Sequence, residues 1–217
     1  MSTKLLRLHF SPGSCSRVTM IALAEAGAEY EATLVSLKDG AHRTPAFRAL
    51  NAKGKVPVLE TPEGVLTENV AILTWLADRH PDARLLPVAD AWQRATSVAA
   101  LAWFASTVHP LLTSVRYPER VCDLAGAPDR VRAAASGELA VQMRAAEDLL
   151  LTRPWMLGDR WSVADAYLFW CWGRCGEAGL DAARFPRIAA NHEATRQRPA
   201  VLRALARERT VQEAVRA

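Results

Sequence analysis

The stretch Ser11-Pro12-Gly13-Ser14-Cys15-Ser16 decides how the first part of this chain is expected to fold. Apolar and polar residues alternate before it, over residues 6–10, which is typical of a half-buried strand. After it, apolar residues recur at helical spacing over residues 18–26. The stretch is therefore predicted to be a turn from a strand into a helix, with Pro12 and Gly13 at the bend.

The start of that helix has two interpretations. Its unpaired N–H groups and the positive end of the helix dipole favour an anion, so Cys15 could be an acidic, reactive thiol, or the turn could hold a bound thiolate or carboxylate. Alternatively, Cys15 is a small buried apolar residue and Ser14 or Ser16 only caps the helix. The turn alone leaves both interpretations open.

Composition places the chain among ordinary soluble globular proteins. Of its 217 residues, 50% are hydrophobic and 23% are charged, which suits one large domain or two small ones. The longest apolar run, residues 98–105, is far shorter than the roughly 20 residues that a bilayer requires, so we expect no membrane span. The first residues enter a strand pattern without a signal peptide, which predicts a cytoplasmic protein.

Charge and ligand spacing exclude two further classes of function. The net charge is +4, but the arginines near the carboxyl terminus alternate with glutamates and have no aromatic residues among them, so no nucleic-acid partner is expected. The four cysteines (Cys15, Cys122, Cys171 and Cys175) show neither disulfide nor zinc spacing, and the five histidines form no ligand cluster. No metal site is predicted.

The first 80 residues alternate strand and helix patterns. A strand over 30–36 follows the first helix, so the strand-helix-strand unit should be parallel. Thr44 and Pro45 begin a short helix, residues 56–59 and 65–67 form an antiparallel hairpin, and a helix then runs to Pro81. Residues 81–90 are a proline-bounded linker. Beyond it the strong patterns are helical, over 92–112, 131–151, 163–179 and 188–206. The predicted class is an α/β domain at 1–80 followed by an all-α domain at 91–217.

Three further positions carry chemical information. Pro57 cannot donate a ladder hydrogen bond, so it marks a strand start or edge. It could be a simple edge-strand proline, or the neighbouring Val56 backbone could be free to pair with something else. Glu68 and Asn69 lie where a helix begins; Asn69 could be a simple cap, while Glu68 offers a carboxylate for an ammonium group. By contrast, the capping-box pattern from Ser162 to Asp165 is predicted to be structural.

Four motifs follow one another along the chain: Ser11-Pro12-Gly13-Ser14-Cys15-Ser16-Arg17-Val18, Gly54-Lys55-Val56-Pro57-Val58-Leu59, Leu66-Thr67-Glu68-Asn69-Val70-Ala71-Ile72 and Ser162-Val163-Ala164-Asp165. With these motifs in this order, the chain resembles the glutathione transferase family over essentially its whole length, closest to the bacterial beta-type enzymes with some similarity to the zeta-type isomerases. The resemblance implies a thioredoxin-like βαβαββα domain that binds glutathione, and an all-helical domain that carries the second-substrate site.

The resemblance also implies roles for individual residues. Pro57 would be in the cis form, so that the Val56 N–H and C=O pair with the cysteinyl backbone of glutathione. Glu68 and Asn69 would bind the ammonium and carboxylate of its γ-glutamyl end. The remaining contacts implied are Lys38 with the glycyl carboxylate, and Cys15 and Ser16 with the sulfur.

His109 matches a histidine that beta-type enzymes direct toward the sulfur, although it could equally be a surface or core histidine before Pro110. The sequence departs from the beta-type pattern at Ala102, where that class usually has Asn. An apolar pocket for the second substrate could be lined by five residues that could also simply be core: Trp103, Phe104, Leu111, Leu112 and Tyr117.

The function implied is conjugation of glutathione, as a thiolate, to a small apolar electrophile. A thiol-disulfide or peroxide reductase acting through Cys15, a zeta-type cis–trans isomerase and a non-catalytic scaffold with the same fold stay open as alternatives. The family also implies a homodimer.

Overall fold

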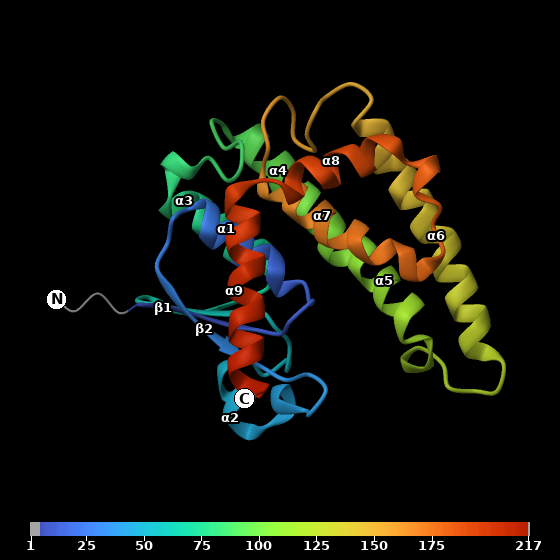
Figure 1. The fold of residues 1–217 in the computed structure, drawn as a ribbon, viewed down its shortest axis with the longest axis horizontal. Coiled ribbons are helices and arrows are strands. Elements are labelled where there is room, and N and C mark those ends of the chain that lie inside the picture. Colours follow the sequence, from blue (N-terminus) through green and yellow to red (C-terminus); the bar gives the residue numbers. More distant parts are fainter. Residues whose placement is uncertain (1–4, 217) are drawn as a thin grey trace. The chain divides into compact units, whose positions relative to one another are not determined.

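The computed structural model describes residues 5–216, which form two compact units (Figure 1). The first, here called the N-terminal unit, consists of the described residues up to Leu85 together with those from Gln197 onward. The second, the helical unit, is Leu86–Arg196. The division after Leu85 falls inside the segment 81–90 that the sequence predicts as a linker.

The N-terminal unit contains a mixed four-stranded sheet in the order β2-β1-β3-β4. β1 pairs in parallel with β2 and antiparallel with β3, and β3 pairs antiparallel with β4. This is the predicted thioredoxin-like βαβαββα arrangement, with β2 ending two residues earlier than expected. Its elements are β1 (Leu6–Phe10), α1 (Ser16–Glu25), β2 (Tyr30–Leu34), α2 (Pro45–Leu50), β3 (Val58–Thr61), β4 (Gly64–Thr67) and α3 (Asn69–Arg79).

Packing of the helices on this sheet fixes where the first turn lies. Leu8 and Phe10 of β1 have no exposed surface, and neither has Ile21 of α1. α1 contacts α3, while α2 places Phe47 against Val35 and Val58. Thr44 accepts a hydrogen bond from the Phe47 N–H and Pro45 occupies the first turn, as predicted. The Ser11–Ser16 turn is thus held between a buried strand and a buried helix.

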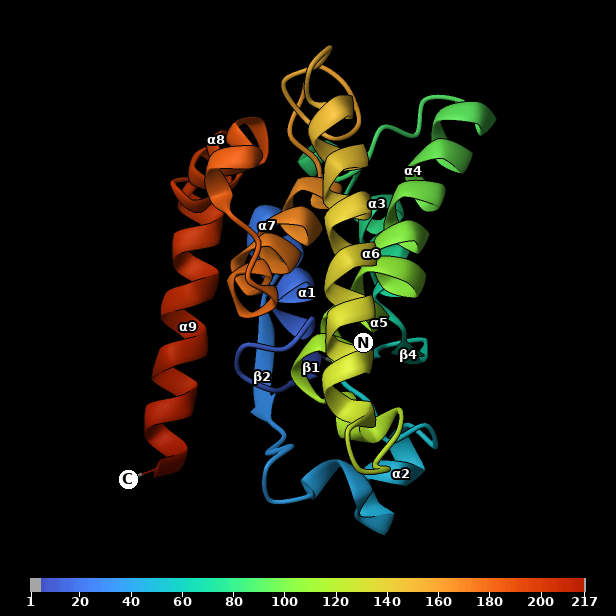
Figure 2. The same cartoon turned by 90° about the vertical axis from the view of Figure 1, so that its right-hand side faces the viewer.

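The C-terminal helix belongs to the N-terminal unit rather than to the helical one. One helix was expected over residues 188–206, within an all-α domain ending at 217. The structure instead has α8 (Pro186–Arg196) and α9 (Pro199–Arg216), because Pro199 has no N–H to continue the first helix. α9 packs along α1 and beside β2, where Val201 is fully buried (Figures 1 and 2).

The helical unit contains α4 (Ala91–Trp103), α5 (His109–Arg116), α6 (Ala127–Leu149), α7 (Val163–Cys175) and α8. A π-helical segment, Phe104–Val108, joins α4 to α5 just before Pro110, whose missing N–H interrupts regular helical hydrogen bonding. The continuous helix Ala91–Arg116 is long and apolar enough to cross a membrane by length and composition alone. Inside the unit, its α5 portion packs against α6 and α7.

A buried capping box begins α7, as the sequence predicts. Ser162 and Asp165 make the two reciprocal bonds of the motif. Asp165 has no exposed surface, and besides the Ser162 N–H at 2.9 Å it accepts from the Met156 N–H at 2.8 Å and the Asn191 amide at 2.9 Å. Burial raises the pKa of this carboxyl above its usual range, which those bonds oppose. Asp165 therefore ties together a loop and two helices.

We expect Asp165→Ala to lower the free energy of unfolding by about 3 kcal/mol or more, because it leaves several buried donors without an acceptor at roughly 1–3 kcal/mol each. Urea denaturation followed by circular dichroism measures this. Asp148→Ala, at an exposed position on α6, is the control and should change stability by less than about 0.5 kcal/mol. Equal effects of the two substitutions would contradict the assignment.

Candidate functional site

The Ser11–Ser16 turn is closed by bonds among its own residues. The Ser14 N–H donates to the Ser11 carbonyl at 3.1 Å, and the Ser14 hydroxyl donates to the same oxygen at 2.7 Å. Gly13 has a φ of 71°, a left-handed conformation that L side chains rarely adopt. The predicted bend at Pro12-Gly13 is therefore present, and it delivers Cys15 to the start of α1.

Ser16 faces the inside of this turn. It has no exposed surface, its hydroxyl lies 2.5 Å from the Ser14 hydroxyl, and it accepts from the Ser11 N–H at 3.2 Å. The resemblance implied a hydroxyl beside a bound sulfur. In the structure the hydroxyl is already used inside the turn, so Ser16 shapes the site, and any contact with a ligand stays a prediction.

Cys15 lies at the N-cap of α1 and is 8% exposed. Its thiol donates to the Val56 carbonyl at 3.6 Å, a distance within reach for sulfur. Burial raises the pKa of this thiol to about 12, and the Glu68 carboxylate adds to the rise, while bonding to backbone N–H and to Asn69 and the charge of Lys55 oppose it. Of the two interpretations of Cys15 that the sequence left open, the structure favours the buried, protonated thiol, because desolvation outweighs the effect of the helix start on its pKa.

The Val56–Pro57 peptide bond is cis, as the resemblance implied. Pro57 is buried just before β3, and Val56 is half-buried. Among residues 5–216, none accepts a hydrogen bond from the Val56 N–H. Val56 therefore has a backbone N–H without an acceptor in the described part of the chain and a carbonyl that contacts the Cys15 thiol. A peptide ligand could form backbone hydrogen bonds with these two groups, as an added strand does.

Glu68 is the N-cap of α3 and has a φ of 72°, an uncommon conformation for a residue other than glycine. Such backbone strain often occurs where a side chain must be held for a ligand. The carboxylate is 61% exposed and lies 2.7 Å from the Lys53 ammonium, which also donates to Thr67 at 2.9 Å. The Glu68 carboxylate thus forms an ion pair with an ammonium group of the protein itself, that of Lys53.

Asn69 is buried and connects the turn to α3. Its amide donates to the Cys15 carbonyl at 3.0 Å, and its side-chain oxygen accepts from the Thr19 hydroxyl at 2.7 Å. The side chain predicted to hold a ligand carboxylate is therefore engaged in bonds within the protein. Asn69 therefore holds the end of the turn and the first part of α1 against α3.

The remaining two predicted residues are Lys38 and His109. Lys38 is exposed in the turn after β2. His109 is half-buried in the helical unit, with its ring edge-on to Trp170 at a centroid distance of 4.7 Å. Phe104 is fully buried and stacks on Tyr167 at 5.4 Å, so it is a core residue. Cys15, Val56, Pro57, Glu68 and Asn69 are the predicted residues that the fold of the N-terminal unit brings together.

Two contributors to this site could not be found from the sequence pattern. Lys53 lies in a polar stretch before Val56 whose pattern predicts no role in a site, yet it forms an ion pair with Glu68. Glu208 is one of the glutamates that alternate with arginines near the carboxyl terminus, a pattern typical of a solvated helix face, yet it is 4% exposed and accepts a hydrogen bond from the first turn. No local signal distinguishes Glu208 from Glu213, the other glutamate of α9, because the burial of Glu208 depends on how α9 packs.

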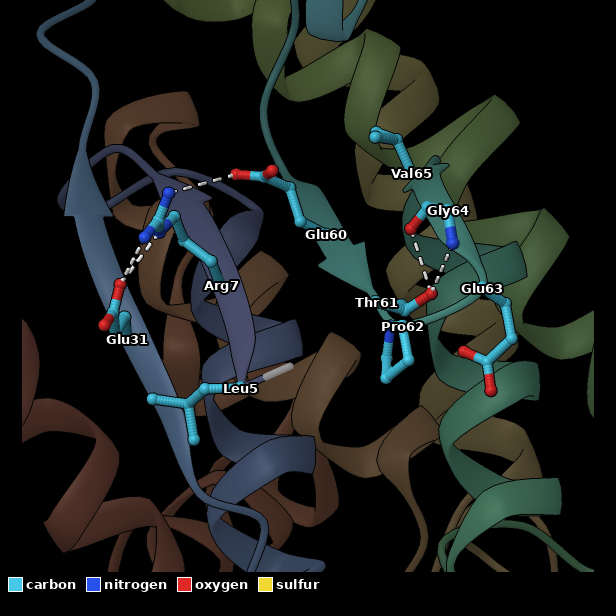
Figure 3. Close-up of a pocket in the computed structure, with 9 residues that line it drawn as sticks. All are labelled: Leu5, Arg7, Glu31, Glu60, Thr61, Pro62, Glu63, Gly64 and Val65. Carbon is cyan, nitrogen blue, oxygen red and sulfur yellow. Dashed lines mark hydrogen bonds and ion pairs between the residues drawn. The ribbon is translucent and has the colours of Figure 1, made fainter. Parts of the chain in front are cut away.

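A separate hollow of about 520 Å³ lies where the β3–β4 hairpin turns (Figure 3). It contains none of the predicted site residues. Arg7 on its wall lies 2.7 Å from the Glu31 carboxylate and 3.8 Å from that of Glu60, so its charge is already matched. Over residues 5–216, no group of three or more histidine, cysteine or acidic side chains could hold a metal ion.

Residues 5–78 match the model of the family described as Glutathione S-transferase, N-terminal domain. The glutathione S-transferase GstA of Escherichia coli is 30% identical over 207 residues, which cover 94% of this chain and 98% of that protein. The maleylacetoacetate isomerase of Pseudomonas aeruginosa is 35% identical over 189 residues, or 82% and 87% of the two chains.

Solved structures that resemble this chain do so over nearly its full length. A glutathione transferase homologue from Sulfitobacter with bound glutathione has a TM-score of 0.86 at 28% identity, covering 94% of this chain and 98% of its own. A sphingomonad glutathione S-transferase complexed with glutathione has a TM-score of 0.82 at 34% identity, covering 93% and 98%. Sequence and fold lead to the same conclusion: this chain belongs to the glutathione S-transferase family.

Proposed function

We propose that the protein is a glutathione transferase that activates glutathione in its N-terminal unit and conjugates it to a small apolar electrophile. One observation carries the proposal: the Cys15 thiol, at the start of α1, donates a hydrogen bond to the Val56 carbonyl, and the Val56 N–H has no acceptor among residues 5–216. Relatives of similar sequence and fold that were solved with glutathione support the choice of ligand. The predicted homodimer and cytoplasmic location are part of the same proposal.

Each group at the site has a chemical role in this proposal. The Val56 N–H and C=O pair with the cysteinyl peptide of glutathione. Its ammonium takes the place of Lys53 on the Glu68 carboxylate. With a pKa of about 12, Cys15 keeps its proton at neutral pH, so its S–H can donate to a glutathione thiolate beside the positive end of α1.

The reaction then needs no covalent intermediate on the protein. The glutathione thiol loses its proton to solvent, and the sulfur electron pair attacks the electrophilic carbon while the leaving group departs with its own pair. The protein lowers the pKa of the bound thiol and orients the sulfur. The role at the sulfur that the resemblance implies for His109 stays a prediction.

Two other activities use the same bound glutathione. A thiol-disulfide or peroxide reductase would need Cys15 as a thiolate, which its burial and raised pKa oppose. A cis–trans isomerase would add the glutathione thiolate to a conjugated double bond and release it after rotation. The 35% identity to a maleylacetoacetate isomerase makes this the second candidate function.

We expect Cys15→Ala to raise the pKa of bound glutathione by about 1–2 units, since a hydrogen bond to a charged acceptor stabilises it by about 1.5–3 kcal/mol. Conjugation of an aryl halide below that pKa should fall about tenfold to a hundredfold for the same reason. Ultraviolet absorbance of the thiolate and initial rates measure the two effects.

Cys122→Ala, at a half-buried cysteine of the helical unit, is the matched control and should behave as the parent does. A parent that binds no glutathione would refute the proposal. Turnover of cis-unsaturated diacids with little conjugation would favour the isomerase, and a Cys15–glutathione adduct detected by mass spectrometry would favour the reductase.

Alkylation of Cys15 by iodoacetamide in the free protein should accelerate about tenfold for each pH unit from 7 to 10, because the thiolate fraction grows in that proportion below a pKa of about 12. Peptide mass spectrometry isolates the rate at this cysteine. A rate that levels off below pH 8 would show an acidic thiol and return Cys15 to the role of nucleophile.

A further inference from the structure

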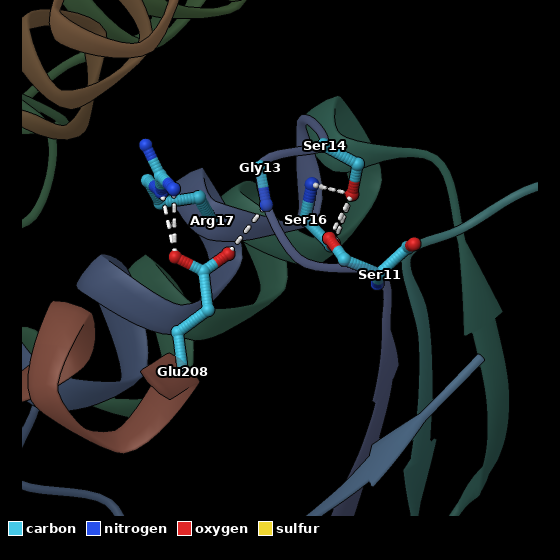
Figure 4. Close-up of polar contacts among 6 residues, drawn as sticks. All are labelled: Ser11, Gly13, Ser14, Ser16, Arg17 and Glu208. Atoms are coloured by element: carbon cyan, nitrogen blue, oxygen red, sulfur yellow. Dashed lines mark hydrogen bonds and ion pairs between the residues drawn. The ribbon is translucent and has the colours of Figure 1, made fainter. Parts of the chain in front are cut away.

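Glu208 of α9 reaches across to the turn that begins α1 (Figure 4). One of its carboxylate oxygens accepts from the Gly13 N–H at 2.7 Å. The other accepts from Arg17, at 2.9 Å from Nε and 2.8 Å from Nη2. The Glu208 side chain is 5% exposed and the Arg17 side chain 28% exposed, so the pair is largely removed from water.

These bonds act on the residues that aim Cys15. Gly13 has its left-handed φ of 71° two residues before Cys15, and Arg17 follows Cys15 by two residues. A buried carboxylate is stable only when paired and hydrogen-bonded, and removing one partner of such a pair is strongly destabilising. Glu208 therefore clamps the turn on both sides of Cys15, while the serine hydroxyls close it from within.

We infer that Glu208 is a positioning residue of the glutathione site, so that α9 contributes a side chain that supports this site. The inference rests on the proposed function. By holding Gly13 and Arg17, Glu208 keeps the Cys15 thiol directed at the Val56 carbonyl. A looser turn would have to be ordered when the ligand binds, which weakens binding and removes the thiol donor from the sulfur.

Two substitutions separate the effect of the Glu208 charge from the effect of its hydrogen bonds on the turn. Glu208→Gln keeps an oxygen that can accept from the Gly13 N–H but removes the negative charge facing Arg17. The turn should stay in place, and the uncompensated Arg17 cation should leave the pKa of bound glutathione at or below the parent value. Glu208→Ala removes every bond, so the turn should loosen and that pKa should rise.

The matched control is a second bridge between the same two helices. Glu25, the last residue of α1, lies 2.7 Å from Arg198, which directly precedes α9. The Glu25 side chain is 15% exposed, so this pair is also partly buried. Glu25→Ala weakens α1 against α9 at the end remote from the turn, and it therefore reports on packing alone.

The test compares the full-length parent with Glu208→Ala, Glu208→Gln and Glu25→Ala. Glu208→Ala and Glu25→Ala should both lower the melting temperature. Glu208→Ala alone should raise the Kd for glutathione about tenfold and speed alkylation of Cys15 about tenfold, because only it removes the pre-organisation of the turn. Glu208→Gln should restore both values to near those of the parent.

Two results would overturn the inference: a folded Glu208→Ala with the parent's Kd and alkylation rate, or a Glu25→Ala that changes both as much as Glu208→Ala does. Should Glu208→Ala fail to fold, Glu208→Asp, one methylene shorter, should change both quantities in the same direction. A parent that binds no glutathione would refute the proposed function, while the alkylation rates would still decide whether Glu208 holds the turn.

Discussion

Buried backbone N–H groups need acceptors, and in this protein carboxylates from separate parts of the chain supply them. A turn or helix start that is packed against the core cannot rely on water, so each N–H without a partner would destabilise the fold. Glu147 of α6 illustrates this, since it is 4% exposed and accepts at 2.9 Å from the N–H groups of two residues that begin α8. Two further carboxylates act in the same way: Asp165 accepts from the N–H groups of Met156 and Ser162, and Glu208 accepts from that of Gly13.

The same constraint shapes the chemistry of the site. Because the turn is buried, Cys15 is desolvated and its thiol holds its proton well above neutral pH. A protonated thiol is a hydrogen-bond donor, whereas a thiolate would be a nucleophile or an acceptor. The burial that stabilises the turn thus favours activation of a bound thiol over redox chemistry at Cys15 itself.

Sequence patterns indicated residues that gather at the candidate site, but not the partners that their polar atoms have within the protein. Cys15, Val56, Pro57 and Glu68 were predicted from a turn, a strand proline and a helix start, each a local pattern. Asn69 and Ser16 also lie where expected, yet their polar atoms bond to the protein's own turn and to α1. The choice among nearby acceptors depends on distances of a few tenths of an ångström, and no residue pattern records these.

By itself the sequence determined the order and type of the elements, because strand and helix periodicity, proline and glycine positions and the capping box depend on residues only a few places apart. It also determined the parallel pairing of β1 with β2, through the handedness of crossovers. The tertiary structure alone decided that α9 joins the N-terminal unit, that Cys15 is desolvated, and that Glu208 meets a glycine 195 residues earlier. Those outcomes depend on which distant surfaces pack together, and a solvated and a buried glutamate look the same in a helical repeat.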